Sequence, residues 1–222
     1  MNAALTGSDA PRKPLNSNRL ALLLSLGAAL GASLVSSGCG LRKDLIEIGY
    51  QAAASAPKVQ GADAVGVGVR MVDSRAIKDN VGRKGSEFDY LGPFIPVNDV
   101  AVTIAKALEQ ELVHRGFKLE SGGVPVLVEL RKFYTEFDRQ AAIERAEVIM
   151  DVQVRKPDST VVFSKTVIGR SAKSGLIVIA GDDAKETLDA ALKEAIGGLV
   201  NDKDFLASLL KAGGKEDTLT FQ

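Results

Sequence analysis

Apolar and polar residues alternate strictly along four segments, and alternation of period two predicts β-strands with one face on a core. The first segment is 64–72, where valines alternate with glycines that leave room for a helix or a second backbone to approach closely. The other three are 124–134, 142–155 and 160–170, and residues 156–159 have the chemistry of a turn. One solvated face per strand is typical of antiparallel sheets.

A period of 3.6 residues predicts the helices. Asn98 and Asp99 precede an amphipathic stretch that Arg115 and Gly116 end, and a second amphipathic helix runs from Gly181 to Val200. A short helix over 205–211 follows. The predicted order is β-α-β-β-β-α-α, which indicates an α+β fold. It is a two-layer sandwich with a mostly antiparallel four-stranded sheet and two long helices on one face.

Three segments show neither period. Residues 39–62 are rich in alanine and serine and are interpreted as a tether that lets a domain over 63–211 stand off a membrane. A short strand around Leu45 to Tyr50 is the alternative for part of this segment. Residues 74–96 form a long polar loop that contains several glycines, and loops of this length are often functional or disordered. Residues 212–222 are interpreted as a disordered tail.

The N-terminal segment has the layout of a secretion signal. Arg12, Lys13 and Arg19 are followed by an apolar run over 20–35, and small residues then lead into Cys39. A cysteine in this place indicates a lipoprotein signal. We therefore expect residues 1–38 to be cleaved away and Cys39 to carry diacylglycerol and a further acyl chain such as palmitate.

The residue after the cysteine indicates the destination. Gly40 stands where an aspartate would retain a lipoprotein in the inner membrane, so we expect the outer membrane, with the domain in the periplasm. Two alternatives remain open. One is an ordinary cleaved signal, which would leave Cys39 as an unpaired thiol. The other is an uncleaved anchor, for which the apolar run is short, since a membrane helix needs about 20 apolar residues.

Charge and cysteine content narrow the classes of partner. The chain has 28 basic and 28 acidic residues, and removal of 1–38, with three basic residues and one acidic, leaves a net charge of −2. No basic block favours nucleic acid or anionic headgroups as the partner. The single cysteine excludes an internal disulfide, and there is no tryptophan, so the fold depends on an aliphatic core.

Candidate catalytic groups are few. His114, the only histidine, lies late in a helix, and one histidine with one lipidated cysteine cannot supply a zinc site. The run 82–86 resembles a phosphate loop but lacks its glycine–lysine order, so it is interpreted as a loop. Asp182 and Asp183 are interpreted as helix capping, and Glu144 with Glu147 as a solvated strand face. We expect no enzyme activity, no metal and no cofactor.

The end of the first strand holds the most suggestive polar group. Asp73 can close an Asx turn, and Arg75 can pair with it, which is a structural role. The alternative is the rim of a binding surface that includes the following loop. Its candidate residues are Asp73, Arg75, Arg83 and Lys84.

The order of these features resembles the YajG-type outer-membrane lipoproteins. The shared features are the signal, a Val-Gly-Val-x-Val strand ending in Asp-x-Arg, a helix running into Arg115-Gly116-Phe117, a Val-x-Val-x-Leu strand and two long alternating strands. The resemblance covers about 64–211. It implies a Gram-negative envelope location and a fold, and it brings no catalytic residues.

Three functions compete on this basis. The leading one is a non-catalytic periplasmic module that binds or supports an unidentified envelope protein. The second is a lipoprotein subunit of a lipid-transport or export complex, by analogy of fold. The third is an enzyme that acts on glycans, for which no pair of carboxylates stands out. The oligomeric state is left open.

Overall fold

The computed structural model describes residues 43–53, 56–85, 92–176 and 179–215. The helical elements are η3 (Ala62–Ala64), α2 (Val100–His114), α3 (Gly181–Val200) and α4 (Lys203–Ala212). The strands of the one sheet are β1 (Asp44–Ile46), β2 (Gly66–Asp73), β3 (Gly82–Lys84), β4 (Gly92–Pro96), β5 (Lys118–Leu119), β6 (Val124–Asp138), β7 (Ile143–Arg155) and β8 (Val161–Ser174).

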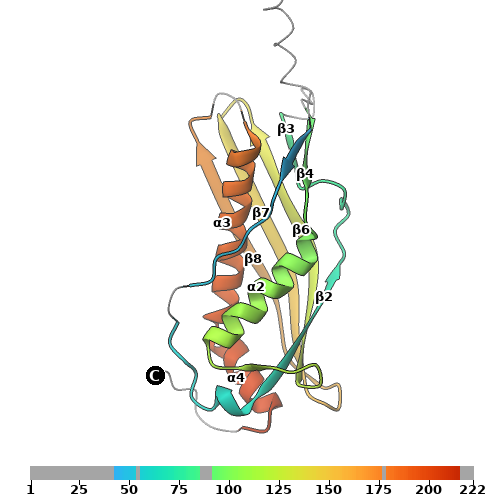
Figure 1. Cartoon of the computed structure of the whole chain (residues 1–222), viewed down its shortest axis with the longest axis vertical. Coiled ribbons are helices and arrows are strands. Elements are labelled where there is room, and N and C mark those ends of the chain that lie inside the picture. The colour runs from blue at the N-terminus through green and yellow to red at the C-terminus, as the bar shows by residue number, and fades with distance from the viewer. Residues whose placement is uncertain (1–42, 54–55, 86–91, 177–178, 216–222) are drawn as a thin grey trace, which may run out of the picture. The chain divides into compact units, whose positions relative to one another are not determined.

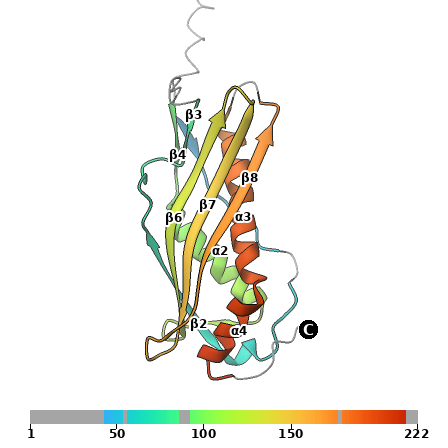
Figure 2. The same ribbon diagram turned by 180° about the vertical axis from the view of Figure 1, so that it is seen from behind.

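The domain has two layers. Helices α2, α3 and α4 all cover the same face of the sheet (Figure 1), and the view from behind shows the other face without a helix over it (Figure 2). We call these the inner face and the outer face. The α+β class and the placement of the long helices on one face agree with the sequence prediction.

The sheet is mixed, so the predicted four-stranded antiparallel sheet is wrong. Strands β6, β7 and β8 are antiparallel neighbours, as predicted, but β2 pairs with β6 in the parallel direction. The reason is the connection between them, since α2 carries the chain back across the sheet before β6 begins. On the same side of β6 as β2, β3 pairs with residues 135 and 136, followed by β4 and β1.

The four strands that sequence reasoning missed are all short. Strands β3 and β4 lie within the segment 74–96, which was predicted to be a loop, and β1 lies within the predicted tether. They contain glycine or proline or only two or three residues, so they show no alternation of their own. Their pairing depends on strands far away in the sequence.

A β-bulge divides the longest strand. The register of β6 against β7 shifts between Leu130 and Lys132, which leaves Arg131 as an extra residue. Buried positions are even-numbered up to Leu130 and odd-numbered from Phe133 onward. The bulge therefore keeps one apolar face on the core along all of β6 and turns two cationic side chains toward the outer face.

Two glycine positions let other elements approach the sheet closely. A Cβ at Gly169 of β8 would lie 2.0 Å from the Ala191 carbonyl oxygen of α3, so this helix packs directly on the strand backbone. At Gly68 of β2 a Cβ would lie 3.0 Å from the Glu120 carbonyl oxygen. The prediction that a second backbone approaches the glycines of the first strand is confirmed.

The segment predicted as a tether is largely part of the domain. Residues 43–53 cross the helical layer, where the Ile48 amide donates to Asn98 (2.9 Å) and the Tyr50 hydroxyl to Glu111 (2.7 Å). Ile46 and Ile48 of this segment are buried, and so are Val59 and Ala62 further along the predicted tether. The domain therefore begins at about residue 43 and not at 63, and α4 extends into the predicted tail as far as Ala212.

The predicted signal 1–38 and Cys39 lie outside the described residues. Within the described part of the chain, no helix has the length and apolar character needed to cross a bilayer.

Candidate binding surface

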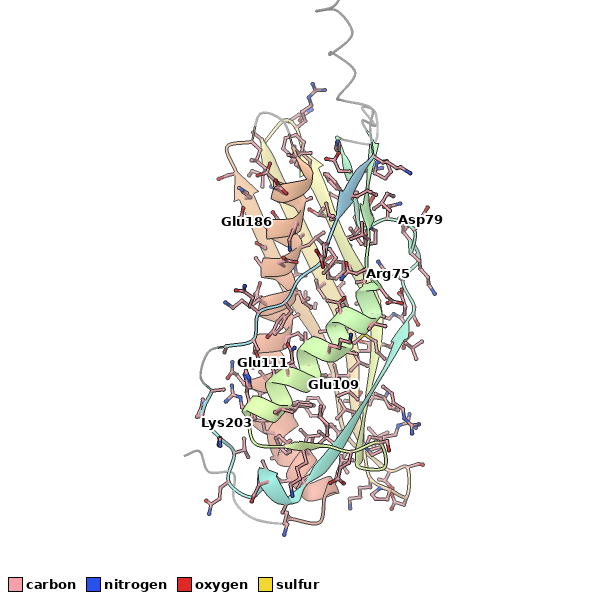
Figure 3. The ribbon with its side chains drawn as sticks, in the orientation of Figure 1. Arg75, Asp79, Glu109, Glu111, Glu186 and Lys203 are labelled. Carbon is pink, nitrogen blue, oxygen red and sulfur yellow. The ribbon has the colours of Figure 1, made fainter. Side chains whose placement is uncertain are left out.

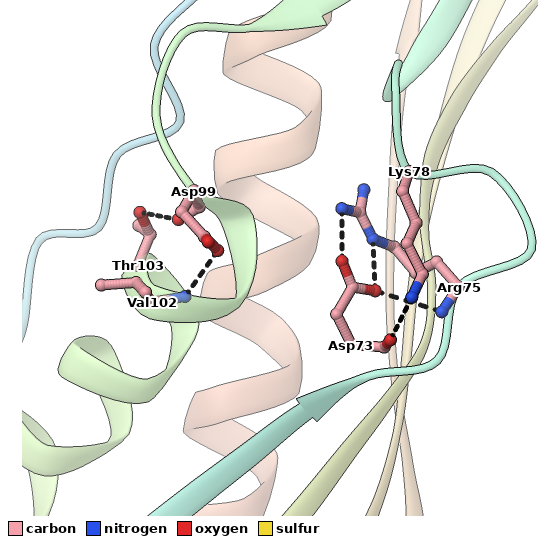
Figure 4. A network of polar contacts seen from close by, with 6 residues as sticks. All are labelled: Asp73, Arg75, Lys78, Asp99, Val102 and Thr103. Atoms are coloured by element: carbon pink, nitrogen blue, oxygen red, sulfur yellow. Dashed lines mark hydrogen bonds and ion pairs between the residues drawn. The ribbon is translucent and has the colours of Figure 1, made fainter.

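The Asp73–Arg75 pair closes the end of β2. The Arg75 backbone amide donates to Asp73 Oδ1 (3.1 Å), which is the predicted Asx turn. Its guanidinium binds both carboxylate oxygens, with Nε 3.0 Å from Oδ1 and Nη2 2.8 Å from Oδ2 (Figure 4). These hydrogen bonds from Arg75 hold the pKa of Asp73 below its usual range. The structural role predicted for the pair is confirmed.

Arg75 is a buried cation. Its side chain is only 5 % exposed, and its Nη1 has no hydrogen-bond partner. It lies beside the first turn of α2 (Figure 3). There it lines a hollow together with Lys78, Asp79 and Asp99. It also lines a second, larger hollow that opens on the outer face. Arg75 therefore has donor capacity beyond its bond to Asp73.

Arg83 and Lys84 point to opposite sides of β3, because successive side chains of a strand alternate. Lys84 is buried and pairs with Asp44 of β1, with 2.8 Å between Nζ and Oδ1. Arg83 lines the same outer-face hollow as Arg75, and its Nε is buried without a hydrogen-bond partner. Of the four candidate residues, the structure thus brings Arg75 and Arg83 to one hollow. Asp73 is the ion-pair partner of Arg75, and Lys84 pairs with Asp44 instead.

This hollow, which we call the bulge hollow, lies where β6 has no strand paired with it on the side away from β7. Strand β2 pairs with β6 only as far as Leu130, and the pairing of β3 with β6 begins at Thr135. The gap of residues 131–134 contains the bulge, and the volume of the hollow is about 540 Å³. It is lined by Arg75, Ala76, Ile77, Arg83, Arg131, Lys132, Phe133, Tyr134, Glu136 and Ile149.

A second hollow adjoins the first along the outer face. It has a volume of about 460 Å³ and shares Lys132, Tyr134 and Glu136 with the bulge hollow. Its floor crosses β7 to reach β8, and Glu147 of β7 lies between Lys132 of β6 (2.9 Å) and Arg170 of β8 (2.8 Å). The bond from Lys132 is the main reason that the pKa of Glu147 is lowered.

His114 and Asp183, two other polar residues singled out in the sequence, line neither of these two hollows. His114 is the last residue of α2, as predicted, and is exposed. Among the described residues, no three His, Cys, Asp or Glu side chains lie close enough together to hold a metal ion. Residues 82–84 form β3, so the run that resembled a phosphate loop begins as a strand. Asp183 caps α3 by accepting from the Ala180 amide (3.2 Å), as expected.

Glu144 differs from its prediction. It lies on the inner face and is fully buried, whereas Glu147 lies on the outer face, so the two do not share a solvated surface. Thr135 Oγ1 donates to Glu144 Oε1 (2.9 Å), and Oε2 has no partner. Burial raises the pKa of Glu144 to about 7. Glu144 falls at an even-numbered position of the strand, as the buried Ala146 and Val148 do. This alternation was the sequence signal that could have placed Glu144 on the inner face.

Comparison with known proteins gives a family and a fold. Residues 41–209 match a protein family described as "uncharacterized lipoprotein". A protein of the DUF330 family from Xanthomonas campestris has a similar structure, with a TM-score of 0.54 and 12 % identity over 77 % of this chain and 96 % of that chain. This likeness extends to the fold alone.

A candidate lipoprotein from Caulobacter crescentus is a weaker structural match. Its TM-score is 0.36, with 13 % identity over 50 % of this chain and 82 % of that chain, which is too low to support an argument. No curated protein sequence matches the chain.

Proposed function

Because the chain belongs to a family of uncharacterized lipoproteins, we propose that it is a non-catalytic binding module held at the outer membrane by a lipid on Cys39. The signal layout before Cys39 supports the anchor, and Gly40 supports the outer membrane. The resemblance to YajG-type lipoproteins supports the same location. Support for a non-catalytic role comes from the sequence, whose one histidine ends a helix and whose one cysteine belongs to the signal.

The anchor keeps the domain close to the bilayer. Strand β1 begins at Asp44, five residues after Cys39. At no more than about 3.5 Å per residue, this connection reaches at most about 17 Å. The predicted stand-off tether of 39–62 is therefore replaced by a short link, and the end of the sheet that holds the start of β1 faces the membrane.

The proposed binding surface is the outer face of the sheet. It is the face that no helix covers, and the two adjoining hollows open on it. Its side chains carry both signs of charge, and several large ones are exposed, among them Arg131, Arg145, Ile168 and Arg170. A surface rich in exposed arginine suits a protein partner, since protein interfaces are enriched in arginine relative to the rest of the surface.

Photo-cross-linking in the native host tests this proposal. The probes replace Ile77, Arg145 and Arg170 on the outer face, which are exposed, and matched probes replace Lys106 and Lys193 on the helices. We expect one dominant envelope protein to be captured from the outer-face positions and not from the helical ones. Equal capture from both sets would contradict the assignment of the surface. Adducts to lipid or to a second copy of the chain would favour the lipid-transport or export subunit instead.

A further inference from the structure

The bulge hollow combines an apolar lining with an excess of positive charge. Four cationic side chains line it, namely Arg75, Arg83, Arg131 and Lys132, against the single carboxylate of Glu136. Ile149, Tyr134 and the buried Phe133 supply apolar surface, and Ile77 is 45 % exposed. Because Phe133 belongs to the core, the hollow reaches from the outer face through the gap in the sheet.

The cations differ in how far their charge is already neutralised. Arg131 pairs with Glu129 (2.8 Å), Lys132 with Glu147 (2.9 Å) and Arg75 with Asp73 (2.8 Å). For Arg83, no carboxylate partner is found among the described residues, and its Nε is buried with no acceptor. Arg75 Nη1 is likewise buried without an acceptor. Both arginines line one hollow, and within the described residues neither guanidinium group has acceptors for all of its N–H donors.

We infer that the bulge hollow binds a small molecule that joins a phosphate or carboxylate group to an apolar body. Arg83 and Arg75 donate to the anionic group, because planar guanidinium groups match the oxygens of phosphate and carboxylate. The apolar body lies against Phe133, Tyr134 and Ile149. A volume of about 540 Å³ is within the usual range for small-molecule sites. This inference names a ligand class for the outer face and so rests on the proposed function.

Calorimetric titration of the full-length lipoprotein in phosphatidylcholine nanodiscs tests the inference. Phenyl phosphate is the probe, inorganic phosphate tests the anionic group alone, and phenyl glucoside tests the apolar body alone. We expect phenyl phosphate to bind at least about tenfold more tightly than either, since each half of the hollow contributes. Inorganic phosphate that binds as tightly as phenyl phosphate, or an absence of phenyl phosphate binding, would overturn the inference.

Variants of Arg83 assign the binding to the hollow. R83Q should weaken phenyl phosphate binding about tenfold or more, and R83K, which keeps the charge, should weaken it less. The matched control is R70Q, because Arg70 is exposed on the outer side of β2 and does not line the hollow. An unchanged midpoint of thermal unfolding shows that R83Q is folded. Equal binding by folded R83Q and by the wild type would overturn the assignment.

A second set of nanodiscs distinguishes the source of the ligand. Phosphatidylglycerol in the disc should compete with phenyl phosphate if the natural ligand is a membrane lipid, and should leave the titration unchanged if the ligand is soluble; both results support the ligand class. If every titration fails while the outer-face cross-links still capture an envelope protein, only the ligand class is lost. The proposed function then stands.

Discussion

At the scale of single residues, folding shifts the pKa values of two carboxyl groups in opposite directions. Hydrogen bonds from Arg75 lower the pKa of Asp73, whereas burial raises the pKa of Glu144. The Asx turn and its arginine partner were predictable, because both groups are local in the sequence. The burial of Glu144 follows from its even position on β7, but a glutamate surrounded by charged residues is easily assigned to the solvated face.

Replacement of Asp73 by asparagine should destabilise the domain. D73N leaves the guanidinium of Arg75 buried without its counter-ion, at a cost of about 2 kcal/mol in the free energy of unfolding. Because the pKa of Asp73 is lowered in the folded state, its contribution is present at neutral pH and is lost as the pH falls below about 4. Urea unfolding at pH 7 measures the loss, and D73N/R75M should recover part of it. A D73N protein as stable as the wild type would contradict the role of the pair.

Replacement of Glu144 by glutamine should stabilise the domain above neutral pH. The pKa of Glu144 rises from 4.5 to about 7 on folding, so the folded state holds this proton more tightly than the unfolded state. The stability of the wild type therefore falls as the pH rises from about 4.5 to 7, and ionised Glu144 costs about 2–3 kcal/mol at pH 8. Urea unfolding at pH 5 and pH 8 should show this loss in the wild type.

Two variants separate Glu144 from other acidic groups. E144Q should remove the loss between pH 5 and pH 8, while E136Q, an exposed change on the neighbouring strand, should keep it. If E144Q is less stable than the wild type at pH 8, the carboxylate has a partner that this account does not include.

At the scale of elements, long periodic segments could be predicted and short ones could not. The three predicted helices and the four alternating strands are all present, because each has enough residues to show its period. Strand β3 has three residues and β4 contains two prolines, so only their neighbours in the sheet define them. The parallel pairing of β2 was missed because alternation does not report strand direction. The bulge at Arg131, which shapes the hollow, leaves no mark in the composition.

Gly169 tests the packing of the helical layer on the sheet. G169V places side-chain atoms where the Ala191 carbonyl oxygen of α3 already lies, so the helix must move away from β8. We expect a loss of about 3 kcal/mol in the free energy of unfolding. The matched control is G198A on α3, because a Cβ at this position meets nothing within 4 Å. This substitution should stabilise the helix by about 0.5–1 kcal/mol. Denaturant unfolding compares the two, and a G169V protein of wild-type stability would contradict this packing.

At the scale of the whole molecule, the proposed lipid on Cys39 and the short link to β1 would fix which end of the sheet faces the bilayer. Asp44 of β1 is paired in register with Phe94 of β4, Phe94 with Gly82 of β3, and Gly82 with Thr135 of β6. These residues therefore lie at the same end of the sheet. The β6–β7 turn, which includes Gln140, therefore lies at the membrane end. The β7–β8 turn, next to Thr160, lies at the far end, because β7 runs the length of the sheet. The sequence alone suggested a tether here, because the apolar Leu45 is exposed and obscures the alternation of buried Ile46 and Ile48 with their neighbours.

Energy transfer from a membrane dye to a labelled turn tests this orientation. A label at Q140C should show strong transfer and a label at T160C weak transfer, since the 13 residues of β7 separate the turns by about 40 Å. A flexible spacer of twenty residues inserted after Gly40 should remove most of the difference. Equal transfer at both turns in the protein without the spacer would contradict a short link.

The intact mass of the protein purified from the outer membrane of its native host tests the central claim most directly. The account predicts a chain that begins at Cys39 and carries a diacylglyceryl group, together with loss of membrane association in C39S. A mature chain that begins elsewhere and carries no lipid, or a C39S protein that stays in the outer-membrane fraction, would contradict it.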